Sequence, residues 1–68
     1  MVEVEVRGDS IRLGQLLKLV DAADSGAEAK ALLADGRVTV NGEPEARRGR
    51  QIRPGDVVDA AGLQIRAV

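Results

Sequence analysis

The sequence contains no aromatic residue, no cysteine and no histidine in its 68 positions. The hydrophobic core must therefore be built from aliphatic side chains, of which there are 7 Leu, 9 Val, 3 Ile and 10 Ala. Disulfides, zinc or iron–sulfur sites and catalysis by cysteine or histidine are excluded. The chain also lacks a platform for stacking bases, which argues against RRM-like and cold-shock-like binding. We expect a small fold held by aliphatic contacts alone.

The charges are unevenly distributed, although the formal net charge is only −1. Residues 1–36 carry 7 acidic and 4 basic residues, whereas residues 37–68 carry 4 acidic and 6 basic residues. One block contains no acid and four arginines: Arg47, Arg48, Arg50 and Arg53. A local positive field of this kind can dock a polyanion even when the total charge is near zero.

No apolar run approaches the roughly 18 residues of a membrane span. Residues 1–7 alternate between aliphatic and charged side chains and do not resemble a signal peptide. We expect a cytoplasmic protein with no membrane-bound part.

Residues 2–6 alternate between valine and glutamate, a period of two that predicts a half-buried strand. A helix is predicted over residues 12–23, because its aliphatic residues recur at the spacing of one helical face: Leu13, Leu16, Leu17 and Val20. A second helix is predicted over residues 26–35, because Ser25 and Glu28 have the capping-box spacing. The residues expected in the core are Leu16, Leu17, Leu32, Leu33 and Val38.

Short strands are predicted for the rest of the chain. The order begins with a strand at 38–40, a hairpin turn at Asn41-Gly42 and a return limb that Pro44 makes an edge strand or an irregular stretch. An Arg-rich loop at 47–50, a turn at 54–56, a strand from Val57 and a strand over 63–67 follow. The fold class is α+β, with a helix pair packed on a small, mostly antiparallel sheet in the order β-α-α-β-β-β, with or without a fourth final strand. Residues 1–68 form one domain.

Catalysis finds little support in these residues. Ser10 and Ser25 both occupy expected helix-cap positions, and no histidine is present to activate them. Glu43 and Glu45 flank a proline in a turn, and no Walker-type phosphate loop is present. We predict that the chain is not an enzyme and holds no cofactor or metal.

Two features could bind an anion. Lys30 and Arg37 are seven positions apart on one flank of the second helix, whereas Glu28 and Asp35 fall on the opposite flank. The second feature is the Arg-rich loop, whose guanidinium groups suit phosphate because they are always charged and bidentate. The alternative for both features is an ordinary solvated surface, and the residues alone leave it open.

A series of motifs resembles the S-four RNA-binding domain, which is named for a small-subunit ribosomal protein. The matching residues are Arg12-Leu13, Ser25, Ala29-Lys30, Leu32-Leu33, Asp35-Gly36-Arg37-Val38, Val40-Asn41-Gly42, Ile52 and Gly55-Asp56, which span about residues 11–58. Residues 14–19 and 41–50 are most similar to a small stand-alone bacterial branch, the YbcJ/YaaA-like proteins.

The resemblance implies an alpha-L motif that binds structured RNA through basic residues and shape. The positions that match the family's contacts are Arg12, Lys30, Arg37, Asn41, Arg47, Arg48 and Arg50. Lys18 matches the closer branch, but its role is open. Gly14 and Gly26 stand where family members often have Asp and Arg, so one phosphate contact is expected to be missing.

We therefore predict a monomeric, non-enzymatic protein that binds structured RNA, with ribosomal and transfer RNA as candidates. One alternative is an adaptor that docks on a ribosome component or an RNA-modifying enzyme through the edge near Pro44 and the Arg-rich loop. Another alternative is an accessory module of an RNA-modifying enzyme whose catalytic chain is separate.

Overall fold

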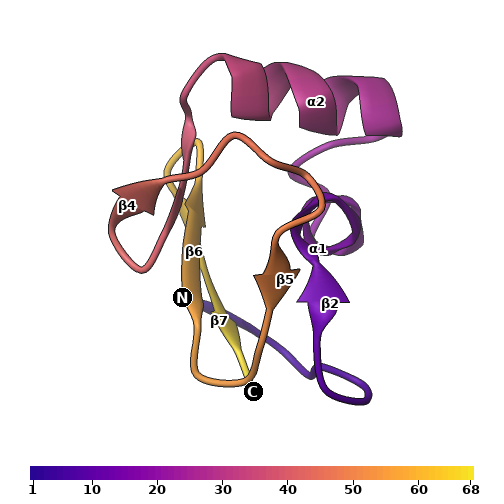
Figure 1. Cartoon of the computed structure of the whole chain (residues 1–68), viewed down its shortest axis with the longest axis vertical. Coiled ribbons are helices and arrows are strands. Elements are labelled where there is room, and N and C mark those ends of the chain that lie inside the picture. The colour runs from indigo at the N-terminus through magenta and orange to yellow at the C-terminus, as the bar shows by residue number, and fades with distance from the viewer.

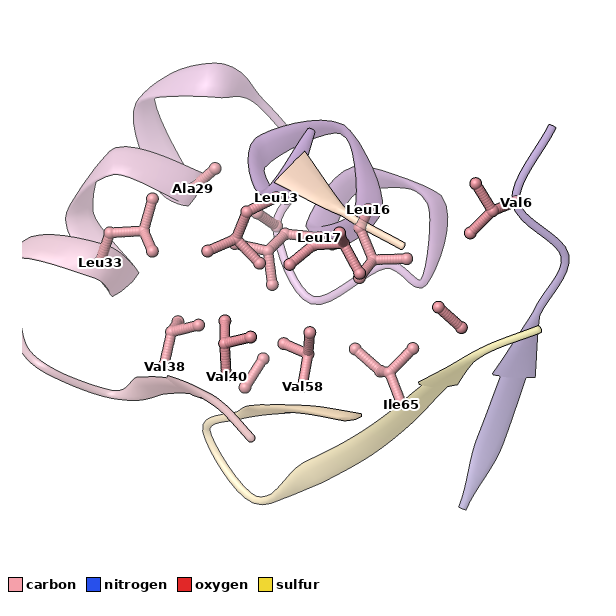
Figure 2. Packing of buried hydrophobic residues seen from close by; sticks show 14 residues of the cluster. Val6, Leu13, Leu16, Leu17, Ala29, Leu33, Val38, Val40, Val58 and Ile65 are labelled. Carbon is pink, nitrogen blue, oxygen red and sulfur yellow. The ribbon is translucent and has the colours of Figure 1, made fainter. Parts of the chain in front are cut away.

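The computed structural model describes residues 1–68. Its elements are β1 (Val2–Val4), β2 (Ile11–Arg12), α1 (Leu13–Leu19), α2 (Gly26–Ala34), β3 (Val38–Val40), β4 (Glu43–Pro44), β5 (Gln51–Ile52), β6 (Val57–Ala60) and β7 (Leu63–Ala67). Figure 1 shows how these elements are arranged. In Figure 2 the two helices lie on one side of the aliphatic core and the sheet lies on the other. The predicted α+β class is confirmed.

The main sheet has five strands in the order β1-β7-β6-β3-β4. Its ladders are antiparallel except for that of β1 with β7, which is parallel. β4 lies at the edge of the sheet, where the missing N–H of Pro44 leaves no gap in a ladder. The turn at Asn41 and Gly42 has φ values of 53° and 84°, as expected for the tight hairpin that these residues predict.

A second, two-stranded sheet was not predicted. In it β2 pairs antiparallel with β5, with Ile11 opposite Ile52 and Arg12 opposite Gln51. Two-residue strands carry no alternation that could be detected in sequence, and the partners are far apart along the chain. The pairing fixes the C-terminal side of the Arg-rich loop beside the start of α1.

The first helix is shorter than predicted, because the chain leaves the helix after Leu19. Asp21 adopts a positive φ of 59°, and the N–H groups of Ala22 and Ala23 both donate to the Leu17 carbonyl, at 3.0 and 3.2 Å. This turn places Ala23 in the core, where it is 2% exposed.

The start of the first helix also differs from the prediction. Its N-cap residue is Arg12, with no side-chain cap, so the capping role expected for Ser10 is wrong. Instead, the N–H of Leu13 donates to the Arg50 carbonyl at 2.8 Å, and the N–H of Gly14 donates to the Arg48 carbonyl at 2.9 Å. The unpaired N–H groups of a helix start are thus satisfied by a distant loop, which sequence patterns do not reveal.

The second helix follows the prediction closely. Ser25 caps it, since its hydroxyl accepts from the N–H of Glu28 at 3.2 Å. The Glu28 carboxylate reaches back one residue further than in a standard capping box and accepts from the N–H of Asp24 at 2.9 Å. At the other end, Gly36 and Arg37 donate to the carbonyls of the last turn in a Schellman arrangement.

The core consists of 14 buried aliphatic residues and includes no buried polar side chain. Figure 2 shows Leu13, Leu16 and Leu17 of α1 above the sheet residues Val58 and Ile65. Four of the five predicted core residues are buried: Leu16, Leu17, Leu33 and Val38. Leu32 is only partly buried against this cluster. Neither helix has the length and apolar character that a bilayer span requires.

Candidate nucleic-acid interface

The Arg-rich loop, residues 47–50, lies against the start of α1. Figure 1 shows the chain between β4 and β5 running below α2 and then turning down beside β2. The bonds that Leu13 and Gly14 donate to the carbonyls of Arg50 and Arg48 hold the loop at this position. Because these contacts are made by the backbone, they do not use the guanidinium groups of Arg48 and Arg50.

Gly14 makes this close approach possible. A Cβ atom at Gly14 would lie 3.3 Å from the Cβ of Arg48 and 3.5 Å from its carbonyl oxygen. The first distance is tighter than a normal van der Waals contact, so the loop would have to shift by a few tenths of an ångström to admit a Cβ. The absence of a side chain at Gly14 therefore suits the close approach of the loop to α1.

The first of two basic hollows lies between the start of α1, the start of α2 and the loop. We call it the helical-side hollow; it is lined by Arg12, Gly14, Gln15, Lys18, Gly26, Ala29, Arg48 and Gly49. Its three cations, Arg12, Lys18 and Arg48, are exposed and form no ion pair, and no acid lines the hollow. Small residues on α2 leave room for a ligand backbone.

The second hollow lies on the other side of the loop. We call it the sheet-side hollow; it is lined by Arg47, Gly49, Arg50, Gln51, Arg53 and Asp56. Its arginines are partly engaged. The Nε of Arg47 donates to Oε1 of Glu45 at 3.1 Å, and Nη2 of Arg53 donates to Oε1 of Gln51 at 3.4 Å.

Asp56 is the single acid of the sheet-side hollow. Its carboxylate accepts from the backbone N–H of Arg53 at 2.9 Å and from Nδ2 of Asn41 at 3.1 Å. These hydrogen bonds lower the pKa of Asp56; partial burial opposes them, and the positive charges of Arg50 and Arg53 add smaller lowering effects. The carboxylate is therefore ionised at neutral pH and offsets part of the positive charge around it.

Asn41, which the resemblance places among the RNA contacts, is used within the protein. Its Oδ1 accepts from the N–H of Val57 at 2.9 Å, its Nδ2 donates to Asp56, and its own N–H donates to the Val57 carbonyl at 2.7 Å. The side chain thus ties the β3–β4 turn to the start of β6. One N–H of the carboxamide is left for a ligand.

Lys30 and Arg37 lie outside the two hollows that the loop arginines line. Both side chains are exposed, but neither lines one of the two hollows. Lys30 lies one helical turn beyond Gly26, next to the helical-side hollow. Arg37 lies beyond the far end of α2, where its carbonyl accepts from Ala61 in the β6–β7 turn at 2.9 Å.

Two cations that the sequence did not assign line the hollows. Lys18 faces away from the apolar stripe of α1, and the structure places it beside Arg12 and Arg48. Arg53 belongs to the acid-free block and lines the sheet-side hollow. Lys18 could have been assigned from its match to the closer branch, whereas Arg53 had no signal beyond its charge.

Comparison with known proteins gives the family. The sequence model of the S4 domain matches residues 4–68. The chain belongs to the S4 domain family. The resemblance drawn from short motifs is therefore confirmed, and the match also includes the last residue of β1 and the whole of β7.

Two relatives cover most of this S4 domain. The probable ribosome maturation protein RlbA of Bacillus subtilis (strain 168) is 46% identical over 60 residues, which are 88% of this chain and 84% of RlbA. YbcJ of Escherichia coli (strain K12) is 40% identical over 58 residues, which are 85% of this chain and 83% of YbcJ.

Two solved structures have the same fold. The solution structure of YbcJ from E. coli, described as having an αL motif involved in RNA binding, matches with a TM-score of 0.76 and 35% identity, and covers 100% of this chain and 87% of YbcJ. The 30S ribosomal protein S4e of Thermoplasma acidophilum matches with a TM-score of 0.66 and 26% identity, over 88% of this chain and 32% of S4e.

Proposed function

We propose that this S4 domain binds structured RNA and carries out no chemistry on it, with the helical-side hollow as its main contact. The observation that carries the proposal is the convergence of Arg12, Lys18 and Arg48 on one acid-free hollow. These cations come from three segments, β2, α1 and the loop, which the backbone bonds of the loop hold together.

The chemistry of the hollow suits an RNA backbone. Arginine binds phosphate in a bidentate manner and lysine binds it as a point charge. Gly26 is exposed at the start of α2 and has no side chain, so the backbone of a ligand can approach the helix closely there. A-form RNA is recognised mainly through shape, phosphates and 2′-hydroxyls, so binding needs no aromatic ring and has little sequence preference.

The relatives suggest which RNA to test first. RlbA is named for ribosome maturation, and one solved structure of this fold belongs to a protein of the 30S subunit. We therefore propose ribosomal RNA as the first candidate and transfer RNA as the second. The protein is proposed to act as a monomer in the cytoplasm.

The salt dependence of binding tests this mechanism. If about four to six phosphates are engaged, log affinity for a ribosomal RNA fragment falls against log salt with a slope of roughly −3 to −5. Replacing Arg12, Lys18 and Arg48 together by Gln reduces both the affinity and the slope. Arg66→Gln serves as the control, since Arg66 is exposed on β7 and lines neither hollow. Binding that is flat between about 50 and 300 mM salt contradicts the mechanism.

The adaptor alternative is supported by one observation, the exposed edge of β4, which pairs only with β3. Such an edge can accept another strand. A pull-down with and without complete RNA digestion separates the two functions. Partners that are lost on digestion support RNA binding, and a partner that survives it supports the adaptor.

A further inference from the structure

The Arg-rich loop is a basic ridge with two sides. Arg48 lines the helical-side hollow, whereas its neighbours Arg47 and Arg50 line the sheet-side hollow, and Gly49 lines both. Positive charge is thus divided between two concave surfaces that meet at the loop. A binding site for a single RNA strand would need only one of these two surfaces.

The ridge is held against α1 by backbone hydrogen bonds at Arg48 and Arg50. Leu13 and Gly14 donate to its carbonyls, the N–H of Arg50 donates to the Arg47 carbonyl at 3.2 Å, and β5 continues it into the ladder with β2. The two hollows are therefore presented at a fixed separation. The loop cannot fold over to bring both sets of cations onto the same phosphates without losing these bonds.

From this arrangement we infer that the protein takes two RNA backbone segments at once, one on each side of residues 47–50. The inference rests on the proposed function and narrows its ligand to double-stranded or folded-back RNA rather than one extended strand. The helical-side hollow holds one backbone, and the arginines of the sheet-side hollow hold the other.

Asp56 defines where the second backbone lies. Because this carboxylate is fixed by Asn41 and by the N–H of Arg53, a phosphate is repelled from that part of the sheet-side hollow. The favourable position therefore lies away from this carboxylate, within reach of the guanidinium groups of Arg47, Arg50 and Arg53, which all line the hollow. We expect the sheet-side contact to be weaker than the helical-side contact, but not zero.

The test uses matched Arg→Gln variants on the two sides of the ridge. Arg48→Gln removes a helical-side charge, Arg53→Gln removes a sheet-side charge, and Arg66→Gln is the control. The side chain of Arg53 donates only to Gln51, and its backbone N–H to Asp56 is kept in the variant. Circular dichroism and thermal unfolding confirm that each variant is folded before binding is measured.

Each variant is titrated with an RNA hairpin and with an unstructured RNA strand of the same length, over a range of salt. For the hairpin, Arg48→Gln and Arg53→Gln each weaken binding about two- to fivefold, as expected for an exposed ion pair. Each also makes the salt slope shallower by about one. In the double variant the two losses multiply. For the single strand, Arg53→Gln behaves like Arg66→Gln.

The outcomes distinguish failure of the inference from failure of the proposed function. If Arg48→Gln weakens hairpin binding while Arg53→Gln matches the control, the protein binds RNA through one hollow and the two-strand inference is wrong. Equal losses from Arg53→Gln on hairpin and single strand also overturn it. If the wild-type protein binds neither RNA, the proposed function itself fails.

Discussion

The two hollows beside the Arg-rich loop contain equal numbers of cations but differ in how those cations are held. Arg12, Lys18 and Arg48 on the helical side have no ionic partner. On the sheet side, Arg47 is paired with Glu45, and Asp56 lies among the arginines. Unpaired charges are available to a phosphate at once, whereas paired charges must first exchange a partner. Both sides of the loop are therefore positively charged, but only on the helical side is there no acidic side chain that competes with a phosphate for the cations.

The largest expected effect comes from weakening the hydrophobic core, which supports both hollows. Leu17 in α1 is fully buried, and Leu17→Ala is expected to cost about 2–5 kcal/mol. In a domain of this size that cost can unfold the protein and abolish both hollows. Urea unfolding measures the change.

Leu19→Ala is the matched control for this change, because Leu19 is in the same helix but 63% exposed. Its effect on stability should stay within about 0.5 kcal/mol. Equal effects of the two substitutions would show that Leu17 does not lie on the buried face of α1.

The next effect tests whether contact between the loop and α1 builds the ridge. Gly14→Val places side-chain atoms against Arg48 and is expected to cost about 1–3 kcal/mol through overpacking. It should also weaken RNA binding, because the loop moves away from Arg12 and Lys18. Gly49→Val is the comparison for stability only, since a Cβ at Gly49 meets nothing within 4 Å but Gly49 lines both hollows. If a folded Gly14→Val variant binds RNA like the wild type, the position of the loop is not important for binding.

Asp56→Asn makes the two hollows more alike by removing the acid from the sheet side. Asparagine can still accept from the N–H of Arg53, so we expect hairpin RNA to bind about two- to fivefold more tightly at neutral pH, the range of an exposed charge interaction. Weaker binding by a fully stable variant would instead show that the carboxylate contacts the RNA.

The same substitution gives a pH prediction. Folding lowers the pKa of Asp56 below its ordinary value of 3.8, so its stabilising contribution is present above that pH. It is lost as the pH falls through the folded-state pKa. The free energy of unfolding of the wild type should therefore fall more steeply below about pH 4 than that of Asp56→Asn. Parallel pH profiles would contradict this assignment.

The smallest expected difference compares the two lysines. Lys18 lines the helical-side hollow and Lys30 does not, so Lys18→Gln should weaken RNA binding about two- to fivefold while Lys30→Gln changes it less. Fluorescence anisotropy with one RNA hairpin measures both. A larger loss for Lys30→Gln would extend the interface along the flank of α2 that the sequence indicates.

Local signals in the sequence predicted most elements of the fold. The leucine spacing of α1, the Ser25 cap, the turn at Asn41-Gly42 and the edge position of Pro44 all depend on residues close in the chain. The same is true of the motifs that indicate the S4 family. Such features can be read from sequence because the physical cause and the structure lie within a few residues of each other.

The arrangement of the site was decided by contacts between distant segments. The β2–β5 ladder and the carbonyls of Arg48 and Arg50 replace the cap that Ser10 was expected to supply. Those contacts also place Lys18 beside the loop. Other long-range contacts join Arg37 to the β6–β7 turn and Asn41 to Asp56. The sequence by itself determined an aliphatic α+β domain of the S4 type with an Arg-rich loop. Only the tertiary structure decided which charges share a surface, because that depends on backbone bonds between residues far apart in the chain.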